Sequence, residues 1–542
     1  MLKTGIGIIL LCLMGSLSST WAQSTTNIGL PKSTDVSKLS AVLQNPDTSL
    51  FDKACACQQL AIVGGRDSVM ALAPLLADEK LGNYARSALE EIHDAAAGDA
   101  LRAAMEKLQG KLLIGVVNSI GVRRDARAVA GLIEVAQNPS RGAAREAVLA
   151  LGRIANDEAS DFLEKILVSG PGELRSAAAE GCVRVAEQVM AQGKQESAMK
   201  LYDAVGRADV PQPLRLAALR GSVLSRQSAG IPLLLENLDS DDLEFREVAL
   251  GIAREIPGSG ATQALAGFLK TARPTVQVGL LKVLIDRNDP SVCGAVEALA
   301  ESDLPQVRTA VMQALGKIGG PTSVPILLKS VATGETGEAD AAAESLRRIS
   351  ASNADALILE AVPSATPEVK ARLIGLLGFR GATIATKELL KQADSDNPAV
   401  AKAAFVALAS VAPVSDLPEV IGLTLTCKDD TVREKAERTA YEIAAKNPDL
   451  TLRSHLVVDA YQKAEDPKAK CSLLRILAMI GGADSCRQLL WAYQDSDGQV
   501  RETAFRALVE WPDSMPASFL LEVFTQSTDK VWRTLALRGL VR

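Results

Sequence analysis

Aromatic residues are scarce in this sequence: Phe, Trp and Tyr make up 3% of the 542 residues, although 47% of all residues are hydrophobic. A core with few rings must be built mainly from Ala, Leu, Val and Ile. These side chains occupy little space, so helices that carry them can approach one another closely. The composition therefore favours closely packed helices.

Histidine is rare, and the common catalytic motifs are missing. The chain has two histidines, His93 and His455, and no HExxH, P-loop, GxGxxG or GxSxG motif, which excludes the classes of site that depend on them. We interpret His93 as a helix-end residue and His455 as the edge of a core. A metal site at either histidine would need a ligand from a distant part of the chain. We predict no catalytic, cofactor-binding or metal-binding residues.

The sequence lacks a basic stripe. It has 59 Lys and Arg against 65 Asp and Glu, a formal net charge of −6, and the two signs are interspersed. Phosphate binding requires clustered cations, so this pattern argues against nucleic acid and anionic membranes as partners. The densest basic cluster, Arg123–Arg127, is interpreted as a solvated turn.

Long hydrophobic runs are absent except near the start. Ile6–Leu17 is apolar but too short for a comfortable membrane span, and Thr20–Ala22 places small residues before a cleavage point. We therefore expect residues 1–22 to be a secretion signal, residues 23–40 to be a polar leader, and the mature protein to be exported, periplasmic or secreted. Of the seven cysteines that remain, Cys471 and Cys486 are the plausible local disulfide pair, and the sequence leaves their pairing open.

A repeat of about 31 residues runs through nearly the whole chain. From residue 245 onward one position recurs in steps of 31, 31, 32, 30, 31, 32, 37, 31 and 31 residues. The complete set of these register positions is Leu50, Tyr84, Leu113, Ala144, Leu174, Leu214, Phe245, Val276, Val307, Ala339, Val369, Val400, Val432, Ala469, Val500 and Val531. A fixed period of this length predicts one small unit stacked many times.

Each unit reads as two helices. In the stretch Val307–Ile318 apolar residues recur every three or four positions, which is the stripe of an α-helix. A shorter apolar stretch such as Ser323–Val331 supplies the other helix. Turns such as Asp394–Asp396 and Asp495–Asp497 precede second helices, and we expect them to cap those helices rather than to bind calcium.

The start of the second helix carries a recognisable pattern, as in Asp303–Arg308, Asn397–Val400 and Asp497–Arg501. With this pattern the chain resembles short HEAT-type repeats of the bilin-lyase-like kind. The resemblance covers residues 41–542 and implies an all-α, right-handed α-solenoid of about sixteen stacked two-helix repeats. It also implies a ladder of ion pairs, for which Asp495 with Arg501 and Asp396 with Lys402 are the candidates.

The last part of the chain is unusually rich in aromatic residues. The candidates for partner binding there are Trp491, Tyr493, Trp511, Trp532 and Leu535. They admit two interpretations: a bulkier core that closes the solenoid, or a docking surface for a partner or for self-association at the C-terminal end.

These observations favour an exported, non-enzymatic scaffold whose concave helical surface binds another protein or an extended peptide. The alternative is an accessory or lyase-like enzyme component with a small-molecule pocket in the solenoid. An open, continuous groove would favour the scaffold, and a closed pocket with buried Asp, Glu or Cys would favour chemistry.

Overall fold

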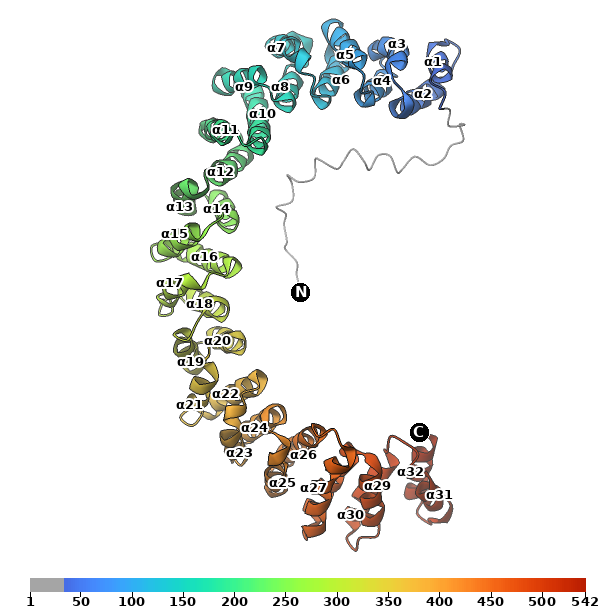
Figure 1. The fold of residues 1–542 in the computed structure, drawn as a ribbon, viewed down its shortest axis with the longest axis vertical. Coiled ribbons are helices and arrows are strands. Elements are labelled where there is room, and N and C mark those ends of the chain that lie inside the picture. The colour runs from blue at the N-terminus through green and yellow to red at the C-terminus, as the bar shows by residue number, and fades with distance from the viewer. Residues whose placement is uncertain (1–33) are drawn as a thin grey trace. The chain divides into compact units, whose positions relative to one another are not determined.

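A computed structural model describes residues 34–542, apart from the side chains of residues 450 and 451, and within this part of the chain all regular structure is helical (Figure 1). The predicted signal segment and most of the predicted leader lie outside the described residues. The first helix, α1, begins at Val36, inside the segment that we expected to be a polar leader.

The helices alternate between a first and a second helix of each repeat. The first helices are α1 (Val36–Gln44), α3 (Arg66–Leu72), α5 (Ala95–Lys107), α7 (Val129–Gln137), α9 (Asp157–Ser169), α11 (Gln195–Arg207), α13 (Ile231–Leu238), α15 (Ser259–Phe268), α17 (Cys293–Glu297), α19 (Ser323–Thr333), α21 (Ala354–Ala361), α23 (Thr386–Ala393), α25 (Leu417–Thr426), α27 (Leu450–Lys463), α29 (Gly482–Ala492) and α31 (Ala517–Gln526). The second helices are α2 (Leu50–Val63), α4 (Gly82–Glu91), α6 (Gly110–Val122), α8 (Ala144–Ile154), α10 (Gly172–Ala191), α12 (Gln212–Arg226), α14 (Leu243–Glu255), α16 (Pro274–Arg287), α18 (Pro305–Ile318), α20 (Thr336–Arg348), α22 (Pro367–Arg380), α24 (Pro398–Val411), α26 (Asp430–Ala445), α28 (Pro467–Ile480), α30 (Gly498–Val509) and α32 (Lys530–Val541).

Every register position predicted from the sequence lies in the first turn of a second helix. Leu50 begins α2, Val307 is the third residue of α18, and Val531 is the second residue of α32. The described residues therefore contain the sixteen two-helix repeats that the period predicts, and the solenoid prediction is confirmed.

The chain divides into two units, residues 1–230 and 231–542, and each is described by itself. Within the first unit α2, α4, α6, α8, α10 and α12 pack on one another in order, and within the second unit α14 to α32 do the same. The first helices form a second layer beside them (Figure 1). We call the layer of even-numbered helices the second-helix face.

Small residues sit where neighbouring second helices cross. A Cβ atom at Gly378 of α22 would lie 2.7 Å from the Cα atom of Ala407 in α24, and one at Gly152 of α8 would lie 2.5 Å from the Cα atom of Gly181 in α10. Real Cβ atoms do not approach so closely, so a larger residue would force the helices apart. The close packing expected from the composition is realised at these crossings.

The turns before the second helices supply helix caps, as expected. Asp497 accepts hydrogen bonds from the backbone N–H groups of Gln499 and Val500 at the start of α30. In the Asp394–Asp396 turn the cap is the next residue, Asn397, which does the same for α24. These caps satisfy N–H groups that have no partner within the helix.

The predicted ion pairs were wrong in register. The carboxylate of Asp495 accepts from Lys470, one repeat earlier, at 2.8 Å, whereas Arg501 donates to the backbone carbonyls of Asp495 and Ser496. Asp396 is exposed and pairs with Lys428 at 3.9 Å instead of Lys402. Both aspartates do pair with basic residues, but their partners belong to neighbouring repeats, which the long lysine side chains can reach.

A second row of cations links consecutive second helices. Arg123, Arg287, Arg380 and Lys446 each donate to backbone carbonyls at the C-terminal end of the preceding second helix. A cation suits the negative end of a helix, and these carbonyls have no partner within it. The expectation that Arg123 belongs to a solvated turn was therefore wrong, and burial lowers its pKa.

Candidate binding surfaces

The second-helix face of residues 231–542 contains a hollow of about 530 Å³ between α20, α22 and α24. Phe379 and Val406 line it with exposed fractions of 60% and 56%, so two adjacent second helices each expose an apolar side chain in one hollow. The guanidinium carbon of Arg347 lies 3.8 Å from the centre of the Phe379 ring, so a cation–π contact holds the ring in place. We call this site the Phe379 hollow.

The charged residues of the Phe379 hollow neutralise one another. Arg372 pairs with Asp340 at 2.9 Å, and Glu344 pairs with Arg347 at 3.0 Å. The ionic groups are therefore already partnered, and the exposed apolar surface is what a ligand would cover.

A second hollow of about 560 Å³ lies on the same face between α26, α28 and α30. At its centre the buried carboxylate of Glu437 accepts hydrogen bonds from two nitrogens of Arg475, at 2.8 and 2.6 Å. This bidentate pair raises the pKa of Arg475. The neighbouring Cys471 sulfur lies 3.3 Å from the hydroxyl of Thr503. We call this site the Glu437 hollow.

Several cysteines outside the two hollows are buried or partly buried, and burial disfavours their thiolate form. A thiolate is the reactive form of cysteine, yet burial raises the pKa of the Cys57 thiol to about 11 and that of Cys182 to about 12. Burial likewise raises the pKa of Cys293. The cysteines of the described residues are free thiols, so the Cys471–Cys486 disulfide that the sequence left open does not form.

His93 lies far from both hollows in the sequence, whereas His455 lies in α27, which connects α26 and α28 of the Glu437 hollow. His93 contacts the carbonyl oxygen of Glu91 at 2.6 Å through Nδ1, and the exposed His455 lies 3.4 Å from a carboxylate oxygen of Asp459. Among residues 34–542 no group of three or more His, Cys, Asp and Glu side chains is arranged to hold a metal ion.

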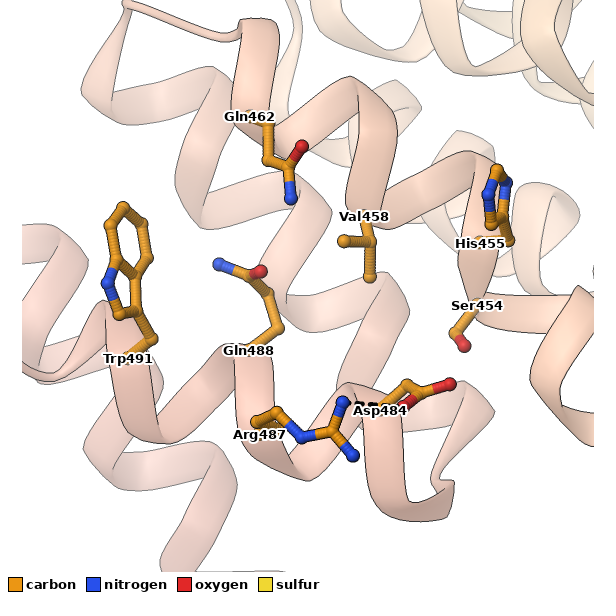
Figure 2. A pocket seen from close by; sticks show the side chains of 8 residues that line it. All are labelled: Ser454, His455, Val458, Gln462, Asp484, Arg487, Gln488 and Trp491. Carbon is orange, nitrogen blue, oxygen red and sulfur yellow. Dashed lines mark ion pairs between the residues drawn. The ribbon is translucent and has the colours of Figure 1, made fainter.

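A groove of about 610 Å³ lies between two first helices, α27 and α29. It is lined by Ser454, His455, Val458, Gln462, Asp484, Arg487, Gln488 and Trp491 (Figure 2). Trp491 has an exposed fraction of 63%, and its ring meets that of the buried Tyr461 nearly at right angles, with 6.3 Å between centres. We call this site the Trp491 groove.

The other predicted partner-binding residues lie apart from this groove. Tyr493, Trp532 and Leu535 are half-buried against a small core formed by Phe505, Val509, Leu520, Val523 and Ala536. Trp532 stacks on Phe505, with 4.5 Å between ring centres and 7° between the planes.

Trp511 is 5% exposed, and its indole nitrogen donates to Asp513 at 3.1 Å. Of the five predicted residues, Trp491 alone places most of its side chain in solvent. Partner binding or self-association through this end of the chain stays a prediction.

Sequence reasoning missed Phe379, although a signal was available. Phe379 comes ten residues after the register position Val369. The same position is polar in nine other repeats and apolar but not aromatic in six: Leu60, Ile154, Leu224, Ile349, Met479 and Val541. Alignment of the repeats would therefore have marked Phe379 as the one aromatic residue at this position.

Comparison with known families finds HEAT repeats at residues 98–182, 262–347, 354–440 and 455–541. Yeast importin-β is similar in structure, with 11% identity over 93% of this chain and 88% of its own, and a TM-score of 0.34. A chain from the phycocyanin lyase complex of Nostoc has 21% identity over 54% and 98%, with a TM-score of 0.22. Human deoxyhypusine hydroxylase has 21% identity over 52% and 95%, with a TM-score of 0.21.

The sequence matches no curated protein. Within the described residues no helix combines the length and the apolar character that a membrane crossing requires.

Proposed function

This chain belongs to the family of HEAT repeats, and we propose that it is a non-enzymatic scaffold whose second-helix face binds another protein or an extended peptide. The Phe379 hollow is the proposed centre of that contact. The export predicted from residues 1–22 is part of the same proposal.

The observation that carries the proposal is the exposed ring of Phe379 beneath the guanidinium of Arg347. Aromatic and arginine side chains dominate the energetic centres of protein interfaces, because they contribute large contact areas at small entropic cost. Val406 adds a second exposed apolar side chain from the next repeat. A partner that covers these groups would remove apolar surface from water without breaking the ion pairs around them.

The length of the second-helix face supports an extended ligand. The Phe379 hollow spans α20 to α24, and the Glu437 hollow spans the next three second helices, α26 to α30. A peptide that runs along consecutive second helices would meet an apolar site and then a charged one. This order of sites would favour one orientation of the peptide along the face.

The enzyme alternative lacks comparable support. Both hollows are open, and both carboxylate oxygens of the buried Glu437 accept hydrogen bonds from Arg475. A general base needs a carboxylate that is available to a substrate proton.

The proposal is tested by quantitative capture of proteins from cells of the source organism, with wild-type protein and two variants. Phe379→Ala removes the exposed ring, and Ile384→Ala is the matched control because Ile384 is also 60% exposed and lies just before α23, outside the lining of the hollow. We expect a partner that is lost with Phe379→Ala and retained with Ile384→Ala. Equal capture by all three proteins would contradict the proposal.

A further inference from the structure

The Trp491 groove is built differently from the second-helix face. It lies between first helices, and α27 and α29 each contribute four of its lining residues. In Figure 2 Gln462 and Trp491 lie toward one end of the groove and Ser454 and His455 toward the other, with Arg487 below Gln488 and directed toward Asp484. Its volume is within the range of small-molecule sites, about 300–1,000 Å³.

The groove carries little free charge. Asp484 and Arg487 pair with each other at 3.1 Å, and His455 lies 3.4 Å from Asp459. An anionic or cationic ligand would have to compete with these internal pairs. The remaining polar groups at the Trp491 end are the carboxamides of Gln462 and Gln488, which both donate and accept hydrogen bonds.

One of those carboxamides lacks a partner. The side-chain nitrogen of Gln488 is buried, and within the described part of the chain nothing accepts a hydrogen bond from it. Buried donors are nearly always satisfied, so an unpaired one points to an acceptor that the protein alone does not provide. Because Gln488 lines the groove, a rotation of its carboxamide would present this nitrogen to a ligand hydroxyl, which would supply the acceptor.

Trp491 supplies an apolar platform next to these amides. Its ring is fixed against Tyr461, whose own ring is buried, while most of the Trp491 side chain stays in solvent. Besides Trp491, Val458 is the apolar residue of the lining. A helical peptide would need a row of apolar contacts at successive turns, and two apolar residues do not form such a row.

These properties define the ligand chemically: it is uncharged, rich in hydroxyl groups, and has a flat apolar face. We propose that the Trp491 groove binds a neutral oligosaccharide, with one sugar ring on Trp491 and its hydroxyls hydrogen-bonded to Gln488 and Gln462. The C–H face of a pyranose ring matches the indole, and its hydroxyls match the carboxamides. This site is independent of the protein-binding surface proposed above.

The test is saturation-transfer NMR and calorimetric titration of the full chain with cellohexaose, mannohexaose and chitohexaose. We expect at least one of these to bind. Trp491→Ala should weaken that binding about tenfold or more, because both the stacking surface and the wall beside Gln488 are lost. Trp491→Phe should retain part of the affinity, and Gln488→Leu should weaken binding without a change in fold.

Phe379→Ala is the matched control, since it removes an exposed ring from the other layer. It should leave oligosaccharide binding unchanged, whereas Trp491→Ala should leave capture of the protein partner unchanged. The proposal is overturned if none of the three sugars binds the wild-type chain, or if binding is the same in Trp491→Ala. Either result leaves the protein-binding proposal standing, because that proposal rests on different residues.

Discussion

The Phe379 hollow and the Glu437 hollow have the same frame of three consecutive second helices and nearly the same volume, about 530 and 560 Å³. Their side chains differ. The first exposes an aromatic ring and a valine, and the second encloses a bidentate ion pair. The repeat therefore sets the geometry of the face, while a few outward-facing positions decide what each part of it can bind.

The comparison extends to single register positions. Six residues after the register position lies Val406 in α24, but Arg475 in α28 and Arg506 in α30. The backbone presents these positions to the same layer, so exchanging apolar for cationic side chains changes the surface without changing the fold.

The largest loss of stability should come from a substitution at the contact between α22 and α24, which both line the Phe379 hollow. Gly378→Val places a branched side chain where even a Cβ would lie 2.7 Å from backbone of α24, and we expect a loss of about 3 kcal/mol in the free energy of unfolding. Gly375→Ala in the same helix is the control, because no atom lies within 4 Å of its added Cβ. It should stabilise the protein by about 0.5–1 kcal/mol. Urea unfolding followed by circular dichroism measures both, and equal midpoints would contradict the close-packing account.

A smaller loss of stability should follow from removing the ion pair of the Glu437 hollow. Arg475→Ala leaves the buried Glu437 carboxylate without its partner, and we expect about 2 kcal/mol of destabilisation because Arg475 itself is half-exposed. Arg506→Ala removes an exposed arginine that pairs with Glu502 within one helix, so it should cost less than about 0.5 kcal/mol. The two urea midpoints would coincide if the Glu437 pair contributed no more than a surface pair.

The hydrogen bond between Lys470 of α28 and Asp495, in the turn before α30, should contribute stability that depends on pH. The pKa of Asp495 is lowered by the backbone N–H of Asp497 and by Lys470. A lowered carboxyl pKa adds stability above the unfolded value of about 3.9, and this stability is lost as the pH falls through the folded value. Asp495→Asn should therefore be less stable than wild type at neutral pH, and the difference should be smaller at about pH 3.

Asp396→Asn is the control for this pH effect. Asp396 is exposed, and its partner Lys428 is 3.9 Å away. We expect wild type and Asp396→Asn to unfold at the same urea concentration at both pH values. A difference between wild type and Asp495→Asn that persisted undiminished at low pH would show that the carboxylate charge is not its source.

The smallest effect on stability should come from Val406. Its side chain is exposed, so Val406→Ala should change the free energy of unfolding by less than about 0.5 kcal/mol. Capture of the proposed partner should nevertheless weaken, because Val406 lies in the Phe379 hollow. Unchanged capture would confine the contact to Phe379 and Arg347.

The sequence predicts the periodic features of this protein well. Positions such as Val307 and Val500 recur at fixed spacing because each occupies the same place in the first turn of a second helix. Asp497 could be recognised as a cap because capping acts within a few residues of the helix start. Both signals are local or repeated.

Features that depend on contacts between repeats are harder to predict. Lys470 reaches Asp495 from the repeat before it, so reading one turn at a time placed the pair on Arg501 instead. The sequence left open whether Trp532 belongs to a docking surface or to a core, and only the contact with Phe505 in another helix places it. Phe379 has no aromatic counterpart at the same position of the other repeats.

The most direct test of the central claim is photo-crosslinking from a benzoylphenylalanine placed at position 379, with position 384 as the control. The account predicts that position 379 crosslinks to a defined protein or peptide and that position 384 does not. Addition of excess unlabelled wild-type protein should remove that crosslink by competition. Crosslinking to the same proteins with equal yield from both positions would contradict a binding surface centred on the Phe379 hollow.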